Sequence, residues 1–465
     1  MRRLTTLILA ATALVPIPAL AQGIPDEVQR QLSAMQAEIA RLSAEVAELK
    51  AEKAAREAPA EPTSAPNAPA VPVAASAPPA SPAAVASAPA TTAAWKGAPE
   101  WTAAGGWSFK PRGRLQLDAA VVDAPDGIAH DSLGVGTEIR RLFLGFDGTL
   151  PGNFGYRFEA DLANSSVELT DVFLTYKPSG AVTLTVGQHK PFTGLEELTS
   201  DLFTSMLERA AFTSAFGFER RVGVSGTYSG GELLVQLGAF TDNARDLNSD
   251  SNNSYSLDGR LVFSPELGAG RLHLGASAHY RDFNDATDVA RYRARPFVHT
   301  TDVRLVDTGE FSATGERHFG AELAYLQGPF HATAEGHVMT TMRPDLADPT
   351  FWGGYVEVGM LVTGGDTTAY RGGAYDRIRP SNPVSAGGIG AIQLNARYDH
   401  IDLSDGAIVG GMQDALGLSA IWMPTDYVRF LINYGHLWVT DAAVPTEQAR
   451  DYQVDTMGVR AQVDF

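Results

Sequence analysis

The chain has 465 residues, of which 44% are hydrophobic, and it contains no cysteine. The lack of cysteine excludes thiolate metal sites, disulfides and cysteine nucleophiles. With 36 Lys and Arg against 54 Asp and Glu, the formal net charge is −18, which argues against a nucleic-acid-binding surface.

Residues 1–21 have the pattern of a secretory signal peptide. Arg2 and Arg3 form a short basic region, residues 4–20 are apolar, and Ala19-Leu20-Ala21 matches a cleavage site. We therefore expect the mature chain to begin at Gln22. A second apolar run of about 18 residues is missing from the sequence, so a membrane location would require a β-barrel.

Residues 22–57 are predicted to form a short coiled coil in the periplasm. Apolar residues recur there at alternating spacings of four and three, which is a heptad. Branched residues at a with Leu at d favour a parallel dimer, although a trimer also fits; the alternative is an amphipathic helix on the protein's own surface. The apolar positions are Val28, Leu32, Met35, Ile39, Leu42, Val46 and Leu49.

Residues 58–106 are rich in Pro, Ala and Ser and are predicted to be a linker. Prolines at this density exclude a helix or a central strand and favour an extended, partly polyproline tether. Such a tether separates the coiled coil from the rest of the chain. Its length favours a second role, contact with the cell wall.

Residues 107–465 are predicted to be an all-β, transmembrane antiparallel barrel. In 155–163, Tyr156 and Phe158 alternate with Arg157 and Glu159, as expected for strands with one side toward lipid and one toward a polar lumen. We expect about 16 strands, or 17 if Arg293 to Leu305 is a strand and not part of a loop. Sixteen is preferred because bacterial barrels have even numbers, and such a barrel encloses an aqueous channel.

The predicted connections fall into two classes, as in outer-membrane barrels. Short links rich in Gly and Pro are expected at 150–155, 177–181, 228–232, 264–270, 327–330 and 423–427. Longer polar links lie mostly between them, at 123–137, 190–219, 242–254, 281–317 and 439–451.

The last segment, 452–465, is predicted to be the strand that closes the barrel. Met457, Val459, Ala461, Val463 and Phe465 occupy every second position, with polar residues and Gly458 between them. A terminal aromatic residue after this alternation resembles the signal by which bacterial outer-membrane barrels are inserted. The alternative is the edge strand of a soluble β-sandwich.

Three segments carry a family resemblance. They are EIRRLFLGFDGTLPGNFGYRFEADLA, VGQHKPFTGLEELTSDLFTSMLERA and AYRGGAYDRIRPSNPVSAGGIGAIQLNARYDHIDL. Each resembles a segment of the phosphate-selective porin O and P family, and the resemblance covers most of 107–465. It implies a homotrimer in which each monomer has its own pore, lined by a ladder of arginines, with lysine clusters that attract anions.

The resemblance also implies the principal pore residues. Arg140 and Arg141 match the family's Arg-Arg pair at the constriction, and RYRARP matches an arginine-bearing loop folded into the pore. A regular strand cannot direct both Arg140 and Arg141 inward, so we expect Arg141 and Phe143 in the lumen and Arg140 at the mouth or in a bulge. The alternative is that Arg140 binds lipopolysaccharide phosphates at the rim. The predicted pore or anion-binding residues are Arg140, Arg141, Phe143, Arg157, Lys190, Arg221, Arg291, Arg293 and Arg295.

The sequence departs from the phosphate pattern in its charges. Only Lys110, Lys177 and Lys190 follow residue 101, so the lysine clusters are missing. Glu196 and Glu197 lie in the loop expected to narrow the pore, where they would oppose the arginines. Arg371 is expected to lie outside the constriction.

The predicted function is an outer-membrane porin for small polar solutes, favouring anions such as phosphate. The alternative is a non-selective or weakly cation-preferring porin that mainly tethers the outer membrane to the cell wall. We do not expect an enzyme, a metal or a cofactor, because motifs such as G-x-S-x-G and H-E-x-x-H are missing, and His273 and His279 fit the lumen wall. The expected partners are outer-membrane lipids and lipopolysaccharide, small anions, further copies of the chain and the cell wall, and not nucleic acid.

Overall fold

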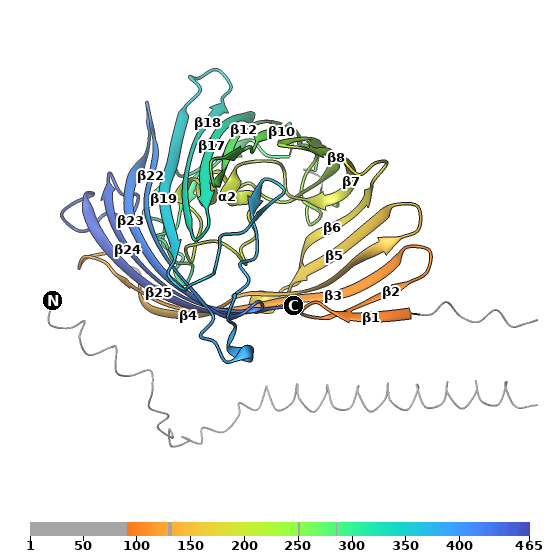
Figure 1. The fold of residues 1–465 in the computed structure, drawn as a ribbon. Helices are drawn as coiled ribbons and strands as arrows, with labels where there is room; N and C mark the ends of the chain where they lie inside the picture. Colours follow the sequence, from red (N-terminus) through yellow and green to blue (C-terminus); the bar gives the residue numbers. More distant parts are fainter. Residues whose placement is uncertain (1–90, 129–132, 250–251, 285) are drawn as a thin grey trace, which may run out of the picture. The chain divides into compact units, whose positions relative to one another are not determined.

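The computed structural model describes residues 91–128, 133–249, 252–284 and 286–465. The predicted signal peptide, the coiled coil and the linker up to residue 90 lie outside these residues. One sheet of 19 strands dominates, and all of them except β1, β2 and the short β11 (Glu266–Leu267) form a closed antiparallel ring of sixteen (Figure 1). The ring consists of β3 (Trp107–Asp123), β4 (Gly134–Leu150), β5 (Phe154–Asp161), β6 (Glu168–Tyr176), β7 (Val182–His189), β8 (Arg221–Gly230), β9 (Leu233–Phe240), β10 (Tyr255–Phe263), β12 (Gly270–Asp282), β17 (Gly315–Gln327), β18 (Phe330–Met342), β19 (Thr350–Leu361), β22 (Ala391–Asp405), β23 (Ile408–Thr425), β24 (Val428–Thr440) and β25 (Tyr452–Asp464).

The last strand closes the ring, as the sequence predicts. β25 pairs with β24 on one side and with Arg114–Asp123 of β3 on the other. Met457, Val459 and Val463 face outward and are exposed, whereas Arg460 is buried inside. The alternation of polar and apolar residues therefore reports the two faces of the wall correctly.

The stretch Arg293 to Leu305 is part of a loop. Between β12 and β17 the chain forms only two-residue strands: β13 (Val289–Ala290), β14 (Arg293–Ala294), β15 (Val306–Asp307) and β16 (Phe311–Ser312). They pair with one another and not with the barrel. Sixteen strands is thus the correct choice.

The linker assignment is wrong for the residues just before the barrel. β1 (Thr91–Trp95) and β2 (Pro99–Ala103) form a hairpin, and β2 continues the sheet at the start of β3. The turn at Lys96-Gly97 lets the chain reverse, because Gly97 has a φ of 83°. Proline is tolerated at Pro99 because it is the first residue of a strand.

The two ends of the barrel differ, with two exceptions to the predicted pattern. All six expected short links join strands at the end where the chain terminates, here called the turn end, and the predicted long links lie at the opposite loop end. However, residues 362–390 between β19 and β22 form a long connection at the turn end. Conversely, β22 and β23 meet at the loop end through a tight turn containing Gly406.

The lumen is not simply an aqueous channel, which corrects the sequence-based expectation. Apolar residues of loop 283–314 and of α3 (Ala211–Phe216) pack inside the barrel against inward side chains of the wall. Phe212, Phe297 and Leu305 are almost completely buried in this core. In Figure 1, α2 (Leu195–Leu198) is likewise seen within the ring of strands. The space left for solutes is therefore decided by the inserted segments.

Candidate pore constriction

Residues 190–220, here called the inner loop, connect β7 to β8 and fold into the barrel. The Glu335 carboxylate on β18 accepts the backbone N–H groups of Leu195 and Glu196 at 2.7 and 2.8 Å. Asp399 on β22 accepts the N–H of Ala211 at 3.1 Å. Buried carboxylates thus satisfy backbone groups at the starts of α2 and α3 and fix the loop against the β18–β22 wall.

The connection 362–390 enters the lumen from the turn end. It forms a small hairpin of β20 (Tyr370–Arg371) and β21 (Ala374–Tyr375). Arg260 donates to the carbonyl of Gly373 at 2.8 Å, and the Tyr370 hydroxyl lies 2.6 Å from Nδ1 of His273. The hairpin therefore fills the lumen beside β10 and β12.

These insertions leave a cavity of about 810 Å³ against the wall formed by β3 to β7. Its lining extends from Arg377 and Tyr427 at the turn end to Glu219 and Arg220 at the loop end. A cavity whose lining reaches both ends of the barrel, between the wall and the inner loop, is the expected route for a solute.

Positive charges predominate around this cavity. Twelve Lys and Arg and seven Asp and Glu line it, although the whole chain has a formal net charge of −18. The cations are Lys96, Lys110, Arg112, Arg114, Arg141, Arg157, Lys190, Arg209, Arg220, Arg371, Arg377 and Arg379; the anions are Glu159, Asp171, Glu197, Asp201, Glu219, Asp376 and Asp464.

A β-bulge in β4 directs both neighbouring arginines inward. Arg141 pairs with Gln116 of β3 and Ile139 pairs with Leu117, so Arg140 is the extra residue of the bulged strand. Arg140 binds the Glu208 carboxylate through two hydrogen bonds of 2.9 and 3.0 Å. The bulge alternative for Arg140 is thus confirmed, and the alternative of a rim residue that binds lipopolysaccharide is wrong.

Two acids of the inner loop compensate the arginines. Asp201 contacts Arg114, and its Oδ2 lies 2.6 Å from Nε of Arg141. Burial alone would raise the pKa of Asp201, but the guanidinium groups of Arg114 and Arg141 hold that pKa well below its usual range. Glu208 is partly buried, and Arg140 and Arg460 hold its pKa well below the usual range. Both acids therefore stay ionised.

Lys190 and Glu197 form a third pair at the start of the inner loop. The ammonium contacts the Glu197 carboxylate, which also lies 3.7 Å from Nε of Arg209. Burial, aided by the charge of Arg209, lowers the pKa of Lys190 to about 8. This ammonium group therefore titrates close to neutral pH.

The structure brings only some of the predicted residues to the cavity. Arg141, Phe143, Arg157, Lys190 and Glu197 line it. Other predicted residues face inward behind the lining: Arg140 with Glu208, Arg221 at 3.9 Å from Glu316, and Glu196 at 2.6 Å from Arg397.

The arginines of loop 283–314 do not line the described cavity, contrary to expectation. The loop does fold inward, but through apolar residues such as Phe297 and Leu305. Arg291 instead pairs with Asp307 at 2.6 Å, Arg295 donates to the carbonyl of His299, and Arg293 is exposed.

Several lining residues were missed. Arg112 and Arg114 alternate with apolar residues on β3, and this alternation was the signal that could have found them. Arg377, which contacts Asp464, comes from connection 362–390, whose insertion carries no periodic signal. Arg371, which we expected outside the constriction, lies on connection 362–390 and lines the same cavity as Arg141.

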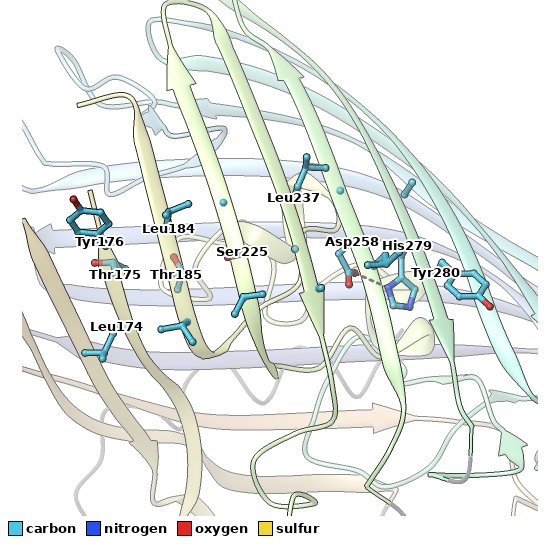
Figure 2. Close-up of a pocket in the computed structure, with 18 of the residues that line it drawn as sticks. Leu174, Thr175, Tyr176, Leu184, Thr185, Ser225, Leu237, Asp258, His279 and Tyr280 are labelled. Carbon is cyan, nitrogen blue, oxygen red and sulfur yellow. Dashed lines mark hydrogen bonds and ion pairs between the residues drawn. The ribbon is translucent and has the colours of Figure 1, made fainter. Parts of the chain in front are cut away.

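A larger hollow of about 990 Å³ lies on the outer face of the barrel. Figure 2 shows Leu174, Leu184 and Leu237 on this face, whereas Asp258 and His279 form their hydrogen bond on neighbouring strands. Leu237 is 62% exposed on this apolar surface. The hollow therefore belongs to the membrane-facing surface and not to the solute path.

The described residues hold neither a helical membrane span nor a cluster of metal ligands. Within that part of the chain, no helix is long and apolar enough to cross a membrane. Nor does it hold a group of three or more His, Asp or Glu side chains placed to bind a metal ion.

A closed sixteen-stranded barrel with a charged lumen narrowed by an inserted loop defines an outer-membrane porin. The family model described as phosphate-selective porin O and P matches residues 109–465. The chain belongs to this family.

Two known proteins are similar to this chain in sequence. An uncharacterized protein of Caulobacter vibrioides is 46% identical over 371 residues, which are 78% of this chain and 75% of the relative. Porin O of Pseudomonas aeruginosa is 27% identical over 337 residues, covering 65% of this chain and 74% of that protein.

Solved structures share the fold. Outer-membrane expressed OmpT of Vibrio cholerae has a TM-score of 0.51 at 10% identity, covering 78% of this chain and 99% of its own. The anion-selective porin from Comamonas acidovorans has a TM-score of 0.50 at 14% identity, covering 77% of this chain and all of its own, 100%.

Proposed function

We propose that this porin favours small anions, with phosphate and related oxyanions as the solutes that its lumen suits best. The observation that carries the proposal is the excess of Lys and Arg around the cavity in a chain whose total charge is negative. Local fixed charges outweigh distant acids, because salt screens exposed charges beyond about 8 to 10 Å. Arginine suits oxyanions because its planar fork donates paired hydrogen bonds and stays charged.

The proposed preference is moderate. Asp201 and Glu208 already occupy the guanidinium groups of Arg114, Arg141 and Arg140. A passing anion must compete with these carboxylates for the same donors. Strong phosphate specificity would need more uncompensated cations, so passive diffusion with an anion preference is the function proposed.

The proposal includes the assembly and the ends of the chain. We propose a homotrimer with one pore per subunit, as the family resemblance implies, and a periplasmic N-terminal region. Cross-linking of the purified protein at a series of concentrations tests the trimer: a ladder that stops at three subunits supports it, and a ladder that stops at two contradicts it.

Single-channel recording in a potassium chloride gradient tests the selectivity. The wild-type reversal potential should show chloride preference, and phosphate should reduce the chloride current by competing for the arginines. Arg141→Glu should move the reversal potential toward potassium. Arg293→Glu is the matched control, because this exposed arginine does not line the described cavity.

Two outcomes would contradict the proposal. Equal shifts in Arg141→Glu and Arg293→Glu would mean that diffuse charge sets the selectivity. A wild-type pore that already prefers potassium would support the alternative, a porin that serves mainly as a tether.

A further inference from the structure

Arg157 on β5 is the most exposed of the arginines that β3, β4 and β5 direct into the cavity. Its side chain is 32% exposed, whereas those of Arg112, Arg114 and Arg141 are 21%, 7% and 12% exposed. Its guanidinium group is therefore the one on this wall that a passing solute reaches most easily.

The ion pairs of Arg157 are long. Its Nη2 lies 3.3 Å from Oδ2 of Asp147, and its Nη1 lies 3.5 Å from Oδ2 of Asp171. Each of these acids lies closer to another arginine, since Asp147 is 2.7 Å from Arg112 and Asp171 is 2.6 Å from Arg220. Both carboxylates are thus shared, so an anion that binds Arg157 displaces no close ion pair.

An aromatic ring lies beside this guanidinium group. Phe173 on β6 is the direct cross-strand neighbour of Arg157, and the two strands lie side by side in the wall (Figure 1). Cζ of Arg157 is 5.5 Å from the centre of the Phe173 ring, within the range of a cation–π interaction. Phe173 is half-buried and lines the cavity. Arg157 and Phe173, here called the ring site, therefore present a cation and an apolar ring together on the expected solute route.

Further rings line the same cavity. The inner loop contributes Phe203 and Phe218, and the link between β23 and β24 contributes Tyr427; all three are half-buried. Phosphate is strongly hydrated and has no apolar surface, so these rings add nothing to its binding. A ring on the solute does gain from them, because apolar surface leaves water and aromatic rings pack offset or edge to face. The lining therefore suits a second kind of anion, one that carries an aromatic ring.

We propose that the ring site binds small aromatic carboxylates, such as benzoate, as they pass through the pore. The solute carboxylate accepts paired hydrogen bonds from the planar fork of Arg157, and the solute ring packs on Phe173. The cavity of about 810 Å³ is large enough for a molecule of this size. This inference rests on the proposed anion preference and adds a class of solute to it.

Block of the single-channel chloride current at neutral pH tests the ring site with benzoate and acetate. The two probes carry the same carboxylate and differ in the ring. Benzoate should block the wild type at about tenfold lower concentration than acetate, because burial and stacking of the ring add to the shared carboxylate contact. Cyclohexanecarboxylate, whose ring is apolar but has no π face, should block at an intermediate concentration.

Variants of the two residues separate the contributions of ring and charge. Phe173→Leu keeps an apolar side chain but removes the flat ring, so it should reduce the ratio of the acetate to the benzoate blocking concentration at least about threefold. Phe173→Tyr keeps the ring and should keep the ratio. Phe158→Leu is the matched control, because Phe158 is an exposed residue of β5 that stacks on the exposed Phe146 outside the lumen. Arg157→Gln should weaken the block by benzoate and by acetate alike, by about tenfold, the effect of a hydrogen bond to a charged group.

Heat-modifiability on gels and unchanged chloride conductance without added carboxylate show that Phe173→Leu is folded. If it does not fold, Phe173→Met replaces it with the same expectation. Four results would each overturn the ring site: equal block of the wild type by benzoate and acetate, equal block by benzoate and cyclohexanecarboxylate, an unchanged ratio in the folded Phe173 variant, or unchanged block in Arg157→Gln.

The same recordings distinguish failure of the ring site from failure of the proposed anion preference. A pore that prefers potassium but is blocked more strongly by benzoate than by acetate overturns the anion preference and supports the ring site. A chloride-selective pore that both carboxylates block equally supports the anion preference and overturns the ring site.

Discussion

Asp201 is the residue whose charge should matter most for selectivity. It reaches from the inner loop to two arginines of the opposite wall, Arg114 on β3 and Arg141 on β4. Asp201→Asn keeps the shape of the side chain and removes one negative charge. The inner loop stays anchored through Glu335 and Asp399, so we expect the variant to fold.

The expected change in anion permeability follows from the distance between the Asp201 carboxylate and an anion in the cavity. An anion held by Arg141 comes within about 5 Å of the Asp201 carboxylate, where two unit charges interact with about 0.8 kcal/mol in water and about 3 kcal/mol at an effective dielectric constant of 20. Because Asp201 is little exposed, the lower value is a minimum. Removing the repulsion should therefore raise anion permeability by at least about fourfold.

Reversal potentials of single channels in a potassium chloride gradient measure this effect. Asp201→Asn should shift the potential toward chloride, and phosphate should block the chloride current at lower concentration, because two guanidinium groups become available. Glu266→Gln on the exposed short strand β11 at the turn end is the control and should change little. A shift toward potassium, or no shift in a correctly folded variant, would refute the reasoning.

Three further predictions concern assembly, the N-terminal region and pH. Deleting Phe465 should lower the amount of heat-resistant barrel, because its backbone bonds Gly113 at 3.0 and 3.2 Å where the ring closes; a normal yield would contradict this. Removing residues 22–85 should leave single-channel conductance unchanged, since every barrel strand follows residue 106, and loss of conductance would identify that region as a plug. Anion preference should fall as pH rises through about 8, because the Lys190 ammonium then loses its charge. In reversal-potential measurements, Lys190→Gln should abolish this pH dependence, whereas the control Lys177→Gln should keep it. If the pH dependence persists in Lys190→Gln, the Lys190 ammonium is not its cause.

The barrel was predictable from the sequence because strand alternation is a local property. Each wall residue faces either lipid or lumen, so Met457 and Arg460 reveal their sides without knowledge of any other strand. The short connections are also a local signal. They contain turn residues such as Gly152 and Gly328, which have positive φ values of 82° and 55°. The closing strand followed from these signals, and they narrowed the strand number to 16 or 17.

The pore itself was decided by tertiary structure. The inner loop, loop 283–314 and connection 362–390 enter the lumen, and their positions depend on partners far away in sequence, such as Glu335 for Leu195 and Arg260 for Gly373. A lumen residue therefore becomes a pore residue only if no inserted segment covers it. Arg140 and Arg141 show the difference, since the sequence offered both as pore residues. The bulge turns both inward, but Glu208 of the inner loop binds Arg140 behind the lining while Arg141 reaches the cavity, and no periodic pattern in β4 encodes the path of that loop.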